Sequence, residues 1–181
     1  MRARGDERDG TRLWVGLLTA TSAVTTLALA CATPFAALAA VAATRMPVRA
    51  GVALMTLAWA VSQTIGFCVL DYPRDARTLA WGLAMLTAAL LSFAGARAAD
   101  RAVATGGPAM RLATAFGAGF VAYKVGLIVW SFVLGGVHTA LSPYWTVRQF
   151  GREAVIVAVL ALLYHALVAA GVPAARRLRA A

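Results

Sequence analysis

A single lysine is the most informative residue of the chain for chemistry. Lys124 is the only lysine, and twelve uncharged residues precede it in a long apolar stretch. A cation at the centre of a bilayer costs at least about 2.5–3.5 kcal/mol, so such residues usually face the interior of a helix bundle and mark a ligand or ion path. The structural alternative is a lysine that snorkels along its stem or pairs with backbone carbonyls. Because no Asp or Glu falls inside a predicted span, Lys124 suits an anionic ligand, or acts as a neutral amine.

Other polar and aromatic residues fall at a similar predicted depth. Gln63 and Lys124 each lie about twelve to thirteen residues from the inner ends of their segments, and His165 lies about as far from the outer end of its own segment. Their sequence neighbours with polar or aromatic groups are Tyr123, Tyr164 and Trp59. We expect these six side chains to form a ligand site anchored by Lys124. For His165 the structural alternative is a core histidine bonded to a hydroxyl or a carbonyl.

A second group of polar and aromatic residues is expected at the outer surface. It comes from two predicted loops and consists of Asp71, Tyr72, Arg74, Trp145 and Arg148. We expect these side chains to form an outer gate over the ligand site. The structural alternative is that the aromatic residues anchor the chain at the membrane interface. The charged residues would then form exposed ion pairs of little energy.

Catalytic, metal and cofactor signatures are missing from the sequence. It contains no HExxH motif, no Walker loop, no serine-elbow motif and no carboxylate pair within a predicted span. A bis-histidine haem needs two histidines at matching depth, whereas only His165 lies in a predicted span. We therefore expect no metal, no cofactor and no enzymatic activity. Cys31 and Cys68 lack metal-site spacing; they either form a disulfide at the outer side or pack as small apolar residues.

Composition places these residues in a membrane protein. Of the 181 residues, 61% are hydrophobic and 13% are charged, against about 45–50% and about 25% in an ordinary soluble domain. The net charge of +10 comes from basic residues clustered at the ends of apolar runs, which is typical of cytoplasmic membrane loops and not of nucleic-acid binders. We predict an all-α polytopic membrane helix bundle in contact with the lipid bilayer. The excess of Arg and Ala indicates a bacterial chain, and hence the cytoplasmic membrane.

Six apolar segments are predicted. The uncharged run from Leu13 to Thr44 is too long for one span of about 20 residues, and Pro34 ends or kinks a helix inside it. Because Arg residues flank this run on both sides, we predict two short segments that form a tight hairpin near Cys31–Pro34. The second, Pro34 to about Val48, is short enough to be tilted, kinked or re-entrant. The remaining four segments are Ala50–Leu70, Thr78–Ala96, Leu112–Val137 and Glu153–Val172.

This alternation places both termini in the cytoplasm. Residues 1–12 are predicted as a charged cytoplasmic segment, 13–173 as the transmembrane bundle and 174–181 as a basic cytoplasmic tail. An alternative is that residues 1–30 are a signal peptide cleaved before Cys31, after the sequence LALA. The acidic residues Asp6, Glu7 and Asp9 are unusual in the n-region of a signal peptide, which favours the uncleaved hairpin.

The layout resembles a known family of transporter subunits. About 180 residues, six apolar segments with a short first pair, cytoplasmic termini and an early helix with Ala36–Ala40 and Ala39–Ala43 spacings are similar to the substrate-binding S subunit of energy-coupling factor transporters. The resemblance implies that the small-residue helix faces a transmembrane coupling subunit, and that vitamins or metal ions bind from the outer side. An N-terminal histidine, expected in the metal-specific members, is missing here.

Two functions from different classes follow. The first is a small membrane subunit that binds and helps to translocate a small anionic or polar solute, with any ATP-driven step carried out by partner subunits. The alternative is a non-catalytic accessory subunit of a larger respiratory or photosynthetic membrane complex, in which Lys124 pairs with a partner's acid or a lipid. A membrane enzyme acting on lipid-like substrates is a third option. No nucleic-acid partner is expected.

Overall fold

The computed structural model describes residues 10, 12–20 and 33–171, and in these ranges helices dominate. Residues 12–20 are helical. The remaining helices are α2 (Phe35–Arg45), α3 (Val48–Cys68), α4 (Ala76–Ala102), α5 (Pro108–Leu134), α6 (Val137–Leu141) and α7 (Pro143–Ala169). The described part of the chain contains no strand, so the predicted all-α class is confirmed for it.

Four helices are long and apolar enough to cross a membrane, namely α3, α4, α5 and α7. They correspond to the last four predicted apolar segments, and the protein is a multi-pass helical membrane protein by the length and composition of these helices. The second predicted segment forms α2, which at 11 residues and 1.5 Å per residue is about 16 Å long. Most of the first segment falls on residues 21–32, outside the described ranges.

The predicted start of the last span is wrong by ten residues. The connection His138–Arg152, predicted before this segment, is helical from Pro143 on, so that Arg148 and Arg152 belong to α7. Ser142 and Pro143 start the helix in the usual way, because proline at the first helical position loses no backbone hydrogen bond. Glu153, the first residue of the predicted segment, therefore lies inside α7 and not at its start.

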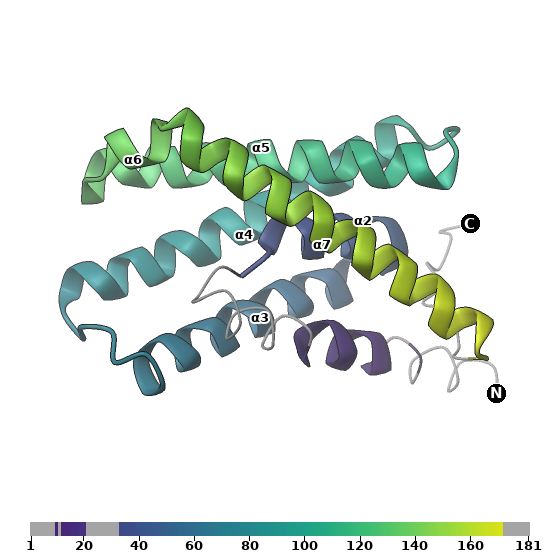
Figure 1. The fold of residues 1–181 in the computed structure, drawn as a ribbon, viewed down its shortest axis with the longest axis horizontal. Coiled ribbons are helices and arrows are strands. Elements are labelled where there is room, and N and C mark those ends of the chain that lie inside the picture. The colour runs from purple at the N-terminus through teal and green to yellow at the C-terminus, as the bar shows by residue number, and fades with distance from the viewer. Residues whose placement is uncertain (1–9, 11, 21–32, 172–181) are drawn as a thin grey trace.

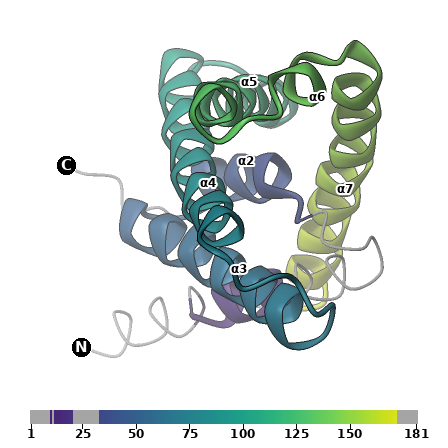
Figure 2. The same cartoon turned by 90° about the vertical axis from the view of Figure 1, so that its left-hand side faces the viewer.

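Helix α2 occupies the centre of the molecule. It contacts α3, α4, α5 and α7, and Figure 2 shows it surrounded by these four helices. Residues 35–43 are all buried, and every alanine among them is fully inaccessible. Alanine side chains let helix backbones approach closely, which is how membrane helices gain packing energy. The alanines of the predicted small-residue motif thus pack inside this chain.

Arginine side chains hold the helices together at one end of the bundle. We call the end with residues 69–75 and α6 the α6 end, and the end with the α4–α5 connection the opposite end (Figure 1). At the opposite end, Arg111 forms an ion pair with the fully buried Asp100 at 2.8 Å. Nearby, Arg97 donates to the carbonyl oxygens of Ala43 and Met46 at the end of α2. Arg97 therefore closes the last turn of α2, whose carbonyls have no partner within the helix.

Glycine allows the sharp change of direction between α5 and α6. Gly135 and Gly136 have φ angles of 84° and 94°, a left-handed region that other residues rarely adopt. A Cβ on Gly135 would also lie 2.7 Å from Arg77 Nη2. The turn brings α6 back beside the last part of α5, and this return forms one wall of the site described below.

Close packing of α4 on α5 generates a first prediction. A Cβ at Gly95 would lie 2.9 Å from Ala122 Cβ and 3.2 Å from the Ala118 carbonyl oxygen, and neither atom can rotate away. We expect Gly95→Ala to lower the free energy of unfolding by about 1–3 kcal/mol, the usual cost of overpacking. Gly117→Ala is the matched control, since nothing lies within 4 Å of its Cβ position. Unfolding in mixed micelles, followed by circular dichroism, measures both variants; equal stability of the two would contradict the packing.

Asp75 generates a second prediction, on pH. Its side chain caps α4 by accepting the Thr78 backbone N–H at 2.7 Å, and this hydrogen bond lowers the pKa of the Asp75 carboxyl below its ordinary value of about 3.9. The cap therefore contributes its full stabilisation above about pH 5, where Asp75 is ionised in the folded and the unfolded state, and loses it as the pH falls through the lowered pKa. The melting temperature of Asp75→Ala should lie below that of the wild type at pH 6, and the gap should narrow towards pH 2. Asp75→Asn, which keeps an uncharged acceptor, should show no such narrowing relative to Asp75→Ala.

Candidate functional site

A cavity of about 480 Å³ opens between α5, α6 and α7 at the α6 end. Its volume is in the range of sites for organic ligands. Residues from four helices and the α5–α6 turn line it: Trp81, Lys124, Leu127, Gly136, Thr139, Ala140, Trp145, Arg148, Gln149 and Arg152. Three of these side chains are cationic, two are tryptophans, and no carboxylate is among them.

The helices set the positions of the three cations. Arg148 and Arg152 are four residues apart on α7 and so lie on the same face, one turn from each other. Lys124 reaches the cavity from α5, and its Nζ donates to the Ala140 carbonyl oxygen in the last turn of α6 at 3.0 Å. A cation at a helix C-terminus satisfies a free carbonyl and the negative end of the helix dipole. Pairing with a backbone carbonyl is the structural alternative that the sequence offered for Lys124. Lys124 nevertheless also lines the cavity.

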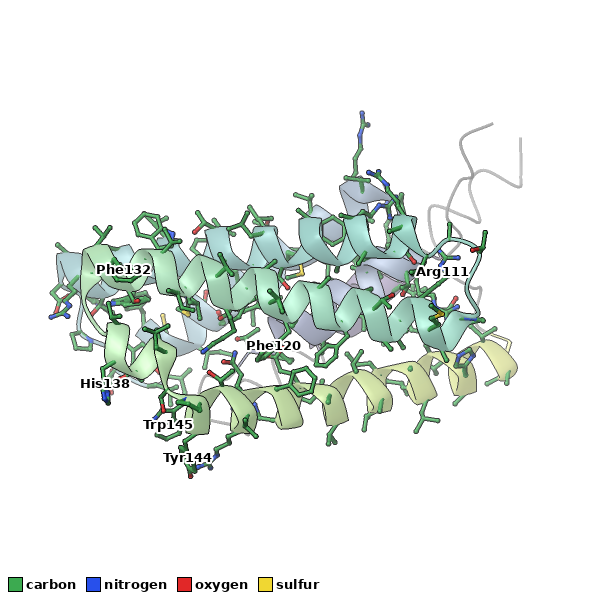
Figure 3. The ribbon with its side chains drawn as sticks, turned by 90° about the horizontal axis from the view of Figure 1, so that it is seen from above. Arg111, Phe120, Phe132, His138, Tyr144 and Trp145 are labelled. Carbon is green, nitrogen blue, oxygen red and sulfur yellow. The ribbon has the colours of Figure 1, made fainter. Side chains whose placement is uncertain are left out.

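Aromatic side chains flank the cations at the mouth of the cavity. The Arg148 guanidinium lies 5.7 Å from the centre of the Trp145 ring, within cation–π range. Figure 3 shows Tyr144 and Trp145 near His138, far from Arg111 at the opposite end. Between α5 and α7, Phe150 packs on Phe120 with ring centres 5.1 Å apart. This aromatic contact holds the two cavity-forming helices together beyond the cavity.

A buried carboxylate lies on α7 directly after the last cavity arginine. Glu153 is fully inaccessible, and its Oε2 accepts the backbone N–H groups of Ala36 and Ala37 at 2.8 and 3.3 Å. Its Oε1 accepts from Gln149 Nε2 at 3.1 Å. The residue before α2 is Pro34, which has no side-chain oxygen to cap the helix. Glu153 therefore acts as the N-cap of α2 from another helix, and a carboxylate is the favoured charge there.

Gln149 connects this cap to the cavity. Its side chain lines the cavity and also donates to Glu153. The geometry of the cavity wall thus depends on a carboxylate that is itself held by α2. Among the described residues no group of His, Cys, Asp and Glu could hold a metal ion.

The predicted ligand residues of α3 lie elsewhere. Trp59 Nε1 donates to the Gly82 carbonyl oxygen at 2.8 Å, and Gln63 lies beside the same glycine, where a Cβ would approach its Oε1 to 2.7 Å. Both side chains therefore pack between α3 and α4, and neither lines the cavity.

The predicted aromatic and histidine ligands are also spread out. Tyr123 is buried with its ring 5.7 Å from that of Phe35 at the start of α2. Tyr164 packs on Trp14 at 4.6 Å and lies under the Arg45 guanidinium. His165 is exposed, four residues before the end of α7. The structure does not bring these residues to Lys124, which is the one predicted ligand residue that lines the cavity.

The predicted outer gate is brought together in part. Trp145 and Arg148 line the cavity, but from the first turns of α7 and not from a loop. Asp71, Tyr72 and Arg74 lie in the α3–α4 connection and do not line it; Arg74 donates to the Phe67 carbonyl oxygen at 3.2 Å. Of the two cysteines, Cys68 is exposed at the end of α3, and Cys31 lies outside the described residues.

Sequence reasoning missed Trp81, Gln149 and Arg152 in the cavity and Glu153 beneath it. A signal for three of them was present, because Ser-Pro at 142–143 is a helix start and residues four apart share a helix face. Extending the last span to Pro143 places Arg148 above Arg152 and Gln149 above Glu153. No sequence signal shows that Trp81 of α4 lines the same cavity as the α7 residues.

The comparisons with known proteins add no relative: no family model, no curated protein and no solved structure matches the chain.

The role of Glu153 generates a third prediction. Glu153→Ala would leave the N–H groups of Ala36 and Ala37 buried without an acceptor, and each buried unpaired group costs about 1–3 kcal/mol. We expect the midpoint of unfolding of this variant to lie at a markedly lower denaturant concentration than that of the wild type. Glu153→Gln keeps one oxygen of the same reach and should lose less. A Glu153→Ala protein as stable as the wild type in mixed-micelle unfolding would show that the cap contributes nothing.

Proposed function

We propose that this membrane protein binds a small anionic solute in the cavity between α5, α6 and α7, and takes part in its transport. The observation that carries the proposal is the charge of the cavity wall. Lys124, Arg148 and Arg152 line one space with no carboxylate among the lining residues. Glu153 acts on Arg152 as a counter-charge, whereas no carboxylate lies beside Lys124 or Arg148 among the lining residues. Cations without a counter-charge are costly in an apolar environment, and an anionic ligand offsets that cost.

The orientation belongs to the same proposal. Near the opposite end of the bundle lie Arg45, Arg49, Arg97, Arg101 and Arg111, with Asp100 as their acidic neighbour. The α6 end has two Asp and two Arg in the α3–α4 connection and first turn of α4, together with Arg148 and Arg152 of α7, so that its excess of positive charge is smaller. Since cytoplasmic ends collect Arg and Lys, we propose that the opposite end is cytoplasmic and that the cavity opens to the outside of a bacterial cytoplasmic membrane.

Any energy-driven step would belong to partner subunits, as the resemblance to energy-coupling factor S subunits implies. The contact with such a partner would use a surface other than the alanines of α2. Ala36, Ala39, Ala40 and Ala43 are fully buried within the chain. By contrast, α7 carries exposed apolar side chains such as Leu162, which suit either lipid or another membrane subunit.

A second candidate is the accessory subunit without a ligand of its own. The observation that favours it is the hydrogen bond from Lys124 to the Ala140 carbonyl oxygen. A lysine that closes the last turn of α6 has a structural role without any solute. In this case Arg148 and Arg152 would meet acidic groups of a partner chain.

Lys124→Met separates the two functions and is the fourth prediction. Native mass spectrometry of the chain released gently from its membrane should show a co-purifying small anion in the wild type. Lys124→Met should lose most of it, because the cavity loses one of its three charges. Arg101→Met is the control: it removes the same charge at the opposite end, away from the cavity, and should keep the anion. Protein partners in fixed ratio without any small molecule, released by Lys124→Met, would instead identify an accessory subunit.

A further inference from the structure

The number and kind of cations in the cavity restrict the ligand's head group. Arg148 and Arg152 present two planar guanidinium groups from one face of α7, and Lys124 adds an ammonium group from α5. The Nε of Arg152 is buried and has no hydrogen-bond partner among the described residues. A guanidinium group can donate two parallel hydrogen bonds to two oxygens of one phosphate. A phosphate monoester carries about −1.5 to −2 charges at pH 7, more than a carboxylate or a phosphodiester brings to a site of three cations.

The other side chains that line the cavity are mostly apolar and would contact an apolar part of the ligand. Leu127, Ala140 and the rings of Trp81 and Trp145 form much of the lining. A free phosphate ion would leave these surfaces against water, and the cavity of about 480 Å³ has the size of sites for organic ligands. The ligand therefore combines a highly charged head with an apolar part.

A second hollow shows where the apolar part can lie. On the outside of α7, Pro143, Tyr144, Val147 and Arg148 line a shallow groove. Tyr144 is 63% exposed and Val147 is 71% exposed, on a helix that is apolar enough to face lipid. Arg148 lines both the cavity and the groove. The charged space and the apolar groove are thus adjacent, with one guanidinium at their boundary.

We infer that the cavity binds the phosphate monoester head of a lipid or similar long-chain molecule, whose apolar chain lies in the groove on the outside of α7. The inference deepens the proposed function and rests on it. Tyr, Trp and Arg side chains at this end of the helix correspond to the depth at which lipid phosphates lie in a bilayer. The ligand enters from the membrane, sideways past Arg148, while Lys124 and Arg152 bind the inner oxygens of the phosphate.

Native mass spectrometry of the full chain in phosphatidylcholine nanodiscs tests this inference. The nanodiscs contain equal minor fractions of phosphatidic acid, which is a phosphate monoester, and phosphatidylglycerol, which is a diester with the same acyl chains. Inorganic phosphate and dodecanoate are added in separate samples. We expect the chain to retain phosphatidic acid at least about tenfold over phosphatidylglycerol and inorganic phosphate, since charge-assisted hydrogen bonds are each worth about that factor.

Variants then assign the binding to the cavity. Arg152→Gln should reduce retention of phosphatidic acid about tenfold, and Arg101→Gln at the opposite end should leave it unchanged. Arg148 is exposed, so Arg148→Gln keeps the test valid if Arg152→Gln fails to fold; it should also reduce retention. Retention unaffected by Arg148→Gln would overturn the inference.

The outcomes separate this inference from the proposed function. Inorganic phosphate, phosphatidylglycerol or dodecanoate retained as well as phosphatidic acid, and lost in Lys124→Met, would overturn the lipid phosphate monoester and leave the anion site standing. Failure of the folded wild type to retain any of the four anions would overturn both.

Discussion

The carboxylate of Glu153 on the first N–H groups of α2 is the interaction on which the arrangement of this protein depends. Helix α2 begins inside the bundle, where no water can satisfy its free N–H groups. Glu153 accepts two of them from α7, so α7 must cross α2 at this residue. With Glu153 fixed there, the preceding turns of α7 place Arg152, Gln149 and Arg148 along the wall of the cavity. One buried cap thereby positions the charged face of a neighbouring helix.

The alanines of α2 make this arrangement possible. Within a membrane, helices gain little from the hydrophobic effect and associate through close contact of their surfaces. A helix surrounded by four others must have small side chains on every face, and residues 36–43 are alanine in all but two positions. The larger residues stand at the ends of this segment, with Phe35 against Tyr123 and Arg45 over the ring of Tyr164. Packing thus fixes α2 along its whole length.

The arginines have different surroundings at the two ends of the bundle. At the opposite end, Arg111 and Arg97 are bound to Asp100 and to the carbonyls at the end of α2. These arginines hold the helices together. At the α6 end, Arg148 and Arg152 line the cavity, and Glu153 is the carboxylate that acts on Arg152. The arginines of the opposite end thus bind acceptors of the packed helices, whereas Arg148 and Arg152 stand beside an open space.

The sequence by itself determined the all-α class and the four long apolar helices, and it singled out Lys124, which lines the cavity. Apolar runs of about 20 residues or more are long enough to cross a bilayer, where helices satisfy all their backbone hydrogen bonds. A lone lysine in such a run usually faces the protein interior. Only the tertiary structure decided which residues join it. Gln63 and His165 have depths that suggested a shared site, yet Gln63 packs on Gly82 and His165 faces outwards. Alanine-rich helices carry almost no apolar periodicity, so their facing directions follow from close packing and from the Glu153 cap, which join residues more than a hundred positions apart.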